Sequence, residues 1–341
     1  MITMRDVAER AGVSVTTVSH VVNKSRTVHP DTRLRVENAV QALGYQPNFL
    51  ARSLRRGISH TVGIILPDNA NPYFAEVVRG IEESMFAQGY SVILCNSDND
   101  LHKEHHHTSV LIEKQVDGII FVAAGLSTEN ITNLKARGIP LVLVDRYVPG
   151  VDADIIVADN HRGGWLATQH LLDLDHRVIA CISGPESIEV SSDRVGGYRQ
   201  AIEDAGIKFD PALVVAGDFQ FQSGYLAAKV LFEHRAPPTA IFTCNDLMAI
   251  GTYRFANENG IKVPEALSIV GFDDTRLAVY SNPPLTTIRQ PKQLMGVRAA
   301  QLLLERLNDG ELQTRKEKMG VELVIRRSTA PHIQPPGEIN T

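Results

Sequence analysis

The chain has 341 residues, of which 43% are hydrophobic and 21% are charged, so it is long enough for two or three globular domains. No run approaches the 18 consecutive apolar residues of a membrane span, and the N-terminal "MITMRDVAERAG" carries acidic residues where a secretory signal would be apolar. These features exclude a membrane-spanning or secreted class and predict a cytoplasmic protein.

The net charge of −5 is distributed unevenly along the chain. Residues 1–60 contain nine Lys and Arg against four Asp and Glu, whereas the remaining residues contain 25 against 35. A small basic part therefore precedes a larger acidic part, as expected if the N-terminal residues bind nucleic acid. The cysteines, Cys95, Cys181 and Cys244, lie in or beside apolar strand-like runs and are expected to be reduced structural thiols.

Residues 1–46 are predicted to form a helix-turn-helix domain. In "RDVAERAGVSVTTVSHVVN", apolar residues recur at helical spacing on both sides of Gly12, which can supply the positive φ of a tight turn, and Ser14 is a suitable N-cap. A third helix is expected from Pro30 to Leu43, ended by Gly44. The alternative is a helical cap with a solvated face, against which the basic charge of this segment argues.

The second helix of such a domain enters the major groove of DNA. Its residues nearest the base edges would be Val15, Thr16 and His20, with Thr17, Ser19 and Asn23 nearer the phosphates.

Residues 47–60 are predicted to form a hinge helix and linker. In "YQPNFLARSLRRG", Pro47 ends the preceding helix and Asn48 can cap a new one of two turns, which is too short to be stable alone in water. A dimer partner and DNA are expected to order it, with Leu54 as a wedge in the minor groove and Ala51 and Arg55 as further DNA contacts.

From Thr61 onward, strand-like and helix-like runs alternate. The runs "TVGIILP", "SVILCNS", "VDGIIFVAA" and "PLVLVD" are followed, after "DIIVADN", by a second series, "RVIACISG", "LVVAGD", "TAIFTCN" and "LSIVGFDD". This rhythm predicts two α/β lobes with parallel, doubly wound sheets over residues 61–330. The last helix, about residues 292–307, and "GVELVIRRS" are expected to cross between the lobes, and residues 331–341 are expected to be a disordered tail.

Polar residues follow several of these strands, where ligands of parallel sheets bind. The pair Asp145-Arg146 ends "PLVLV", and "PDNANPYF", Asn245-Asp246 and Asp273-Asp274 occupy equivalent places. Each could be a turn or cap residue, and Asp246 is expected to be an N-cap, but together they predict a polar site between the lobes. Carboxylates, guanidinium groups, amides and aromatic rings suit a sugar.

The motifs "DVA", "AGVS", "TVS" and "ARSL" in residues 1–57 resemble the DNA-binding head and hinge of the lac repressor and purine repressor family. This resemblance implies that Leu54 intercalates at the centre of a palindromic operator bound by a dimer. The later residues also resemble the periplasmic ribose-binding protein, whose pattern has Phe where Tyr73 stands; the extra hydroxyl would crowd the site or add one hydrogen bond. The ligand residues that the resemblance implies are Asn71, Tyr73, Phe74, Asp145, Arg146, Arg194, Phe219, Asn245, Asp273 and Gln290.

Other signals are weaker. His102 and His106 share a helix face as zinc ligands can, but no further ligand completes a site by spacing, and a solvated outer helix is expected instead. No nucleotide-binding or hydrolase motif occurs, so neither an enzyme nor a cofactor is predicted. A sugar-modifying enzyme and a bare sugar-transport module remain as alternative classes, but the basic head argues against the transport module.

The sequence therefore predicts a dimeric transcriptional repressor of ribose uptake and catabolism, with ribose as inducer. Another small sugar or a purine co-repressor is the alternative effector. No heptad repeat that would make tetramers follows residue 330.

Overall fold

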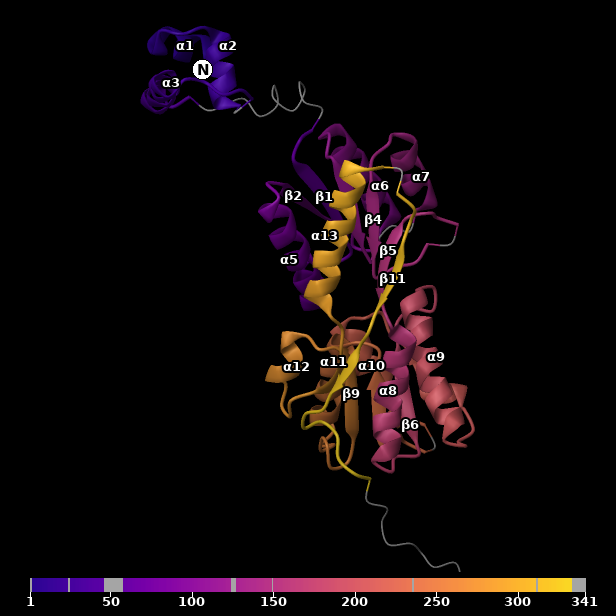
Figure 1. Ribbon diagram of the computed structural model, residues 1–341. Coiled ribbons are helices and arrows are strands. Elements are labelled where there is room, and N and C mark those ends of the chain that lie inside the picture. Colours follow the sequence, from indigo (N-terminus) through magenta and orange to yellow (C-terminus); the bar gives the residue numbers. More distant parts are fainter. Residues whose placement is uncertain are drawn as a thin grey trace, which may run out of the picture. The chain divides into compact units, whose positions relative to one another are not determined.

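The structure, a computed structural model, describes residues 2–23, 25–45, 58–123, 127–148, 150–234, 236–310 and 312–332 (Figure 1). It divides into two compact units, Met1–His60 and Thr61–Thr341. The predicted hinge helix, with Ala51, Leu54 and Arg55, lies outside the described residues, as do residues 333–341 of the predicted tail.

The described part of the head contains three helices, α1 (Met4–Ala11), α2 (Val15–Val22) and α3 (Pro30–Leu43). Gly12 joins the first two with a φ of 63°, and the Ser14 hydroxyl accepts a hydrogen bond from the Thr17 backbone N–H at 3.1 Å. Val7, Val18 and Val36, one from each helix, are fully buried and form a shared core. The predicted helix-turn-helix is confirmed.

The first lobe is a six-stranded, wholly parallel sheet in the order β11-β5-β4-β3-β1-β2. Its central strands are apolar on both faces because helices cover both sides of the sheet. Its elements are β1 (Thr61–Leu66), α5 (Pro72–Ala87), β2 (Ser91–Asn96), α6 (Leu101–Glu113), β3 (Gly118–Val122), α7 (Thr128–Ala136), β4 (Leu141–Val144), β5 (Asp154–Ala158), α13 (Lys292–Asn308) and β11 (Lys316–Met319).

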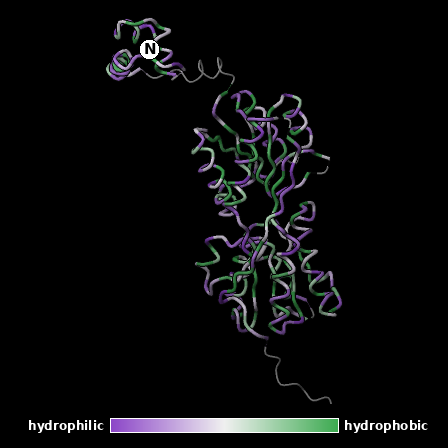
Figure 2. Tube along the Cα trace, in the orientation of Figure 1, coloured by the Kyte–Doolittle hydropathy of each residue, from purple (hydrophilic) through white to green (hydrophobic). Residues whose placement is uncertain are grey.

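The second lobe repeats this architecture in the order β12-β10-β9-β8-β6-β7, with only the edge strand β12 antiparallel among the strands of the described residues. Figure 2 shows hydrophobic residues concentrated along the strands of both lobes. The elements are α8 (Asn160–Asp173), β6 (Ile179–Ser183), α9 (Glu189–Asp204), η1 (Pro211–Leu213), β7 (Val214–Ala216), α10 (Phe221–Phe232), β8 (Ala240–Thr243), α11 (Asp246–Glu258), β9 (Ser268–Asp273), α12 (Arg276–Tyr280), β10 (Thr286–Arg289) and β12 (Glu322–Val324).

The chain crosses between the lobes three times, between β5 and α8, between β10 and α13, and between β11 and β12. Helix α13 packs on α5 of the first lobe, and the last crossing is the long yellow segment in Figure 1. The predicted return of the last helix and of "GVELVIRRS" across the lobes is confirmed. Strands β10 and β11 were not predicted, because "TTIR" and "KEKM" are short and mostly polar.

Two residues of the predicted tail, Pro331 and His332, are described by the structure. The His332 backbone N–H donates to the Leu174 carbonyl at 2.8 Å, and its ring stacks on that of His176 with centroids 5.4 Å apart. Pro331 and His332 therefore belong to the second lobe, because these contacts offset the polar composition on which the prediction rested.

Candidate functional site

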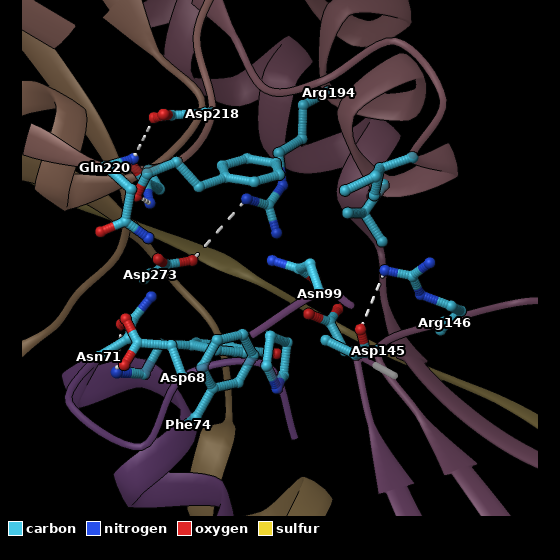
Figure 3. Close-up of a pocket in the computed structure, with 17 residues that line it drawn as sticks. Asp68, Asn71, Phe74, Asn99, Asp145, Arg146, Arg194, Asp218, Gln220 and Asp273 are labelled. Atoms are coloured by element: carbon cyan, nitrogen blue, oxygen red, sulfur yellow. Dashed lines mark hydrogen bonds and ion pairs between the residues drawn. The ribbon is translucent and has the colours of Figure 1, made fainter. Parts of the chain in front are cut away.

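A cavity lies between the facing ends of the two sheets (Figure 3). Its empty volume is about 620 Å³, open mouth included. Nine of the ten predicted ligand residues line it: Asn71, Tyr73, Phe74, Asp145, Arg146, Arg194, Phe219, Asn245 and Asp273. The topology brings them together because each lies at or near the carboxyl end of a strand or the start of a helix facing the cleft.

The start of α5 forms one part of the first-lobe wall. Asn71 caps the helix, and its side-chain oxygen accepts from the Tyr73 backbone N–H at 3.0 Å. The rings of Tyr73 and Phe74 meet edge to face with centroids 5.2 Å apart. Together they give this wall an aromatic surface suited to the C–H face of a small ring.

Asp145 and Arg146 do not form a salt bridge with each other. Asp145 has a φ of 57° directly after β4, and its Oδ1 is buried without a hydrogen-bond partner. Arg146 donates from Nη2 to the Ala123 carbonyl at 2.9 Å. Both side chains are buried at the cavity, so the charged pair that ends "PLVLV" is one edge of a polar site.

Arg194 is the central cation of the second-lobe wall. Its Nε donates to Asn160 Oδ1 at 2.8 Å, its Nη1 donates to the Cys244 carbonyl, and its guanidinium carbon lies 3.8 Å from the centroid of the Phe272 ring. The helices α8 and α9 approach so closely that a Cβ on Gly164 would lie 2.1 Å from the Arg194 carbonyl oxygen. This packing fixes the base of the Arg194 side chain and leaves its outer end 3.8 Å from Asp273 Oδ1.

The Asp273 turn is held in an uncommon conformation. Asp273 and Asp274 have φ values of 108° and 51°, and the buried Lys292 ammonium donates to both of their carbonyl oxygens. Gln290 does not line the cavity. Its Nε2 donates to Asp273 Oδ1 at 2.7 Å, so the structure places it behind the carboxylate.

Burial controls the ionisation of the two cleft carboxyls. Loss of hydration raises the pKa of Asp145 above the ordinary carboxyl value and raises the pKa of Asp273 to about 8, while the positive charge of Arg194 opposes both shifts. Burial also raises the pKa of the Tyr73 hydroxyl well above its usual value, so this group stays a neutral donor and acceptor.

Two buried polar atoms that line this site, the Tyr73 hydroxyl and Asp145 Oδ1, have no hydrogen-bond partner in the protein. Leaving such an atom unsatisfied costs about 1–3 kcal/mol. A ligand with several hydroxyl groups could form hydrogen bonds with these atoms, so the site favours a polyhydroxylated ligand.

The amide Asn245, and not Asp246, caps α11. Asn245 Oδ1 accepts from the Met248 backbone N–H at 2.9 Å, and its Nδ2 donates to the Phe219 carbonyl at 2.9 Å. The prediction that Asp246 is an N-cap is wrong. Asp246 accepts from the Thr275 backbone N–H at 2.7 Å and from the Thr287 hydroxyl at 2.6 Å, and thus ties α11 to the segments after β9 and in β10.

The sequence interpretation missed several residues that line the cavity. Asp68 and Asn99 follow β1 and β2, and Asp218 and Gln220 flank Phe219 after β7, so their positions after strands were the available signal. The apolar Ile188 and Val190 at the start of α9 carry no such signal. The cleft is therefore more acidic and has one more apolar surface than predicted.

The predicted DNA-reading residues lie on α2 of the head. Val15 and Thr16 are exposed, and the His20 Nδ1 lies 2.9 Å from the Ser25 hydroxyl. Thr17 Oγ1 pairs with the Ser14 hydroxyl at 2.9 Å, and Asn23 Nδ2 donates to the Ser19 carbonyl at 2.8 Å. Their contacts with DNA stay predictions.

His102 and His106 are exposed on α6, and the described part of the chain contains no cluster of three His, Cys, Asp or Glu side chains suited to a metal ion. Among the described residues, no helix is both long enough and apolar enough to cross a membrane.

A helix-turn-helix head joined to a two-lobed core with a polar interlobe cleft defines a ligand-responsive DNA-binding regulator. The model for "bacterial regulatory proteins, lacI family" matches residues 3–48, and that for "periplasmic binding proteins and sugar binding domain of LacI family" matches residues 59–327. The chain belongs to the LacI family of bacterial transcriptional regulators.

Similar proteins include an HTH-type transcriptional repressor PurR of Aliivibrio fischeri, 40% identical over 96% of this chain and 98% of the relative. A LacI family regulator from Enterococcus faecium with bound ribose is 34% identical, with a TM-score of 0.73 over 80% of this chain and 100% of that one. The lac repressor dimer bound to operator and the anti-inducer ONPF is 29% identical, with a TM-score of 0.87 over 96% and 99% of the two chains. The chain is a transcriptional repressor that responds to a small ligand, and not an enzyme.

Proposed function

We propose that this repressor binds a palindromic operator as a homodimer in the cytoplasm, controls ribose uptake and catabolism, and releases the operator when ribose fills the interlobe cleft. The observation that carries the effector assignment is the convergence of unsatisfied polar atoms, two carboxylates and two guanidinium groups on an aromatic wall. Hydroxyl groups can donate to Asp145 and Asp273 and accept from Arg146 and Arg194. The Enterococcus regulators that carry bound ribose, at 33% and 34% identity, support this assignment.

A purine co-repressor is the second candidate, because the PurR relatives share about two fifths of their residues with this chain. A purine presents several donors and acceptors along its edges, which need polar partners in the plane of the base. Ile188 and Val190 give one side of the cavity an apolar surface, which can cover the face of a purine as well as that of a sugar ring, so the binding experiment must separate the two candidates.

Isothermal calorimetry with the full chain tests the assignment against a panel of pentoses, hexoses and purine bases. D-ribose is expected to bind more tightly than any other member of the panel. Tight binding of guanine or hypoxanthine together with no heat from ribose would show that the effector is a purine and not ribose.

Tyr73→Phe tests whether the unsatisfied hydroxyl serves the ligand. The change should alter the unfolding free energy of the sugar-free protein by less than about 1 kcal/mol, because the hydroxyl makes no close hydrogen bond and has only the Asp145 carboxyl as a polar neighbour, and it should weaken ribose binding by roughly fivefold, since one hydrogen bond is lost. Calorimetric unfolding and ribose titration measure the two effects. The matched control is Tyr198→Phe, which should instead lower stability, because the Tyr198 hydroxyl donates to the Ile179 carbonyl at 2.8 Å. Tighter ribose binding by Tyr73→Phe would mean that the hydroxyl crowds the site.

Leu54→Ala tests the proposed hinge wedge. The change should weaken operator binding by a few kcal/mol at most, comparable to one unstacked base step, and leave ribose affinity unchanged. Arg55→Ala should instead reduce the salt dependence of operator binding by about one unit, because a phosphate contact is lost. Leu34→Ala, an exposed leucine on α3, serves as the control. Equal operator affinity of Leu54→Ala and wild type would contradict the wedge.

A further inference from the structure

The interlobe cleft continues past Asp145 and Arg146 into a second cavity, which shares Ile188 and Val190 with the first. The two cavities together are lined by more acidic than basic residues. The acidic residues are Asp68, Asp145, Asp218, Asp273, Glu186 and Glu189, and the basic residues are Arg146 and Arg194.

Both guanidinium groups already have partners within the protein. Arg194 donates hydrogen bonds to Asn160 and to the Cys244 carbonyl and lies close to Asp273. Arg146 donates a hydrogen bond to the Ala123 carbonyl. The inner carboxylates, Asp145 and Asp273, roughly balance the two arginines when ionised. The four acids nearer the openings then have no basic counterpart among the lining residues, and Lys316, outside the lining, lies close enough to Glu189 to act on its charge.

Helix N-termini are the other common site for an anion, and two of those at this cleft are already capped by side chains. Asn71 caps α5 and Asn245 caps α11 with their side chains. Helices α9 and α10 have no side-chain cap, but α9 begins with Glu189, and Asp218 lies three residues before the first residue of α10. A phosphate group approaching either α9 or α10 would therefore meet a carboxylate.

We propose that the cleft selects an uncharged sugar and rejects its phosphate esters, and that Asp68, Asp218, Glu186 and Glu189 contribute this discrimination. The inference rests on the proposed sugar-binding function and adds the charge class of the effector. The repressor would then respond to the free sugar, before a phosphorylating reaction consumes it. With both inner carboxyls protonated, the four outer acids still outnumber the two arginines by two charges.

Calorimetry of the full chain with D-ribose, D-ribose 5-phosphate and 5-O-methyl-D-ribose tests the inference, since the methyl ether separates bulk at this position from charge. The wild type should bind the phosphate on the order of 100-fold more weakly than ribose, because a charged group would lose its hydration in a cavity where acidic side chains outnumber basic ones. The combined variant Asp68→Asn, Asp218→Asn, Glu186→Gln and Glu189→Gln should recover roughly tenfold of this difference at 0.15 M salt. The amides keep the oxygens that accept from the Ala70 and Gln220 backbone N–H groups.

The matched control neutralises four exposed acids that line neither cavity, Glu113, Glu203, Glu258 and Glu265, and should leave the ratio of affinities unchanged. In 1 M salt the wild type should approach the neutralised variant, because the screening length falls to about 3 Å. Neutralisation should change the affinities for the methyl ether and for ribose by the same factor.

Phosphate binding by the wild type as tight as ribose binding would overturn the inference, as would a preference unchanged by neutralising the four acids. If ribose gives no heat but another uncharged sugar binds more tightly than its own phosphate ester, the ribose assignment fails and the charge inference stands.

Discussion

Asp145→Ala is expected to weaken ribose binding by about 100-fold or more, because the carboxylate is buried at the cleft and its Oδ1 has no hydrogen-bond partner in the protein. A sugar hydroxyl that loses this acceptor is left buried without a partner. Arg146→Ala should weaken binding by well over tenfold for the same reason, because its guanidinium lies at the same edge of the cavity. Titration calorimetry measures both losses.

His106→Ala is the control for these variants. His106 is exposed on α6 and lines neither interlobe cavity, so its removal should change neither ribose affinity nor stability. A loss of ribose binding in His106→Ala, with binding kept in Asp145→Ala, would show that the ligand does not occupy the interlobe cleft.

Arg194→Met is expected to abolish measurable ribose binding and to destabilise the protein. The change leaves Asn160 Oδ1 and the Cys244 carbonyl without their donor, which should cost about 2 kcal/mol at pH 6. It also removes the charge nearest to Asp273 Oδ1 among the ion pairs of the described residues.

The loss of unfolding free energy caused by Arg194→Met should be greater at pH 9 than at pH 6. Burial raises the pKa of Asp273 in the folded protein to about 8, so this carboxyl lowers the free energy of unfolding progressively from its ordinary pKa up to about pH 8, and it is ionised in both states at pH 9. Arg194 reduces that lowering because its charge favours the ionised carboxylate. Unfolding calorimetry at the two pH values, with the exposed Arg199→Met on the same helix as control, measures the difference. An equal loss at both pH values would contradict the coupling.

The sequence was sufficient to predict the head and most of the cleft because both depend on local signals. Gly12, Ser14 and Gly44 fix the helix boundaries of the head through turn and cap conformations that few residues favour. The doubly wound rhythm places residues after strands at one edge of each sheet, which brought Asp145 and Asp273 to a shared cleft.

The features that were missed or misplaced depend on contacts distant in sequence. Asp246 follows a strand and precedes a helix, which is where an N-cap residue is expected. Its hydrogen-bond partners, Thr275 and Thr287, are instead 29 and 41 residues further along the sequence. Gln290 was predicted to touch the ligand, whereas its hydrogen bond to Asp273 places it behind the lining residues. Ile188 and Val190 are apolar like core residues, and only the folded arrangement puts them at the cavity.

Both lobes contribute to the site, Asp145 and Arg146 from the first and Arg194, Asn245 and Asp273 from the second. A ligand that contacts both walls favours the closed arrangement of the lobes over the open one. It can change operator affinity only by as much as its own affinity differs between the closed and the open arrangement. The proposed hinge helices connect this change to the operator, because helices of two turns are ordered only by a partner and by DNA.

The most direct test is a titration of ribose into the full chain with and without saturating operator DNA. The free energies of the two binding events are linked, so operator must weaken ribose binding by the factor by which ribose weakens operator binding, typically about 5- to 150-fold. We expect weaker ribose binding on DNA by a factor in this range. Identical ribose affinities with and without operator would contradict the account, and tighter binding on DNA would make ribose a co-repressor.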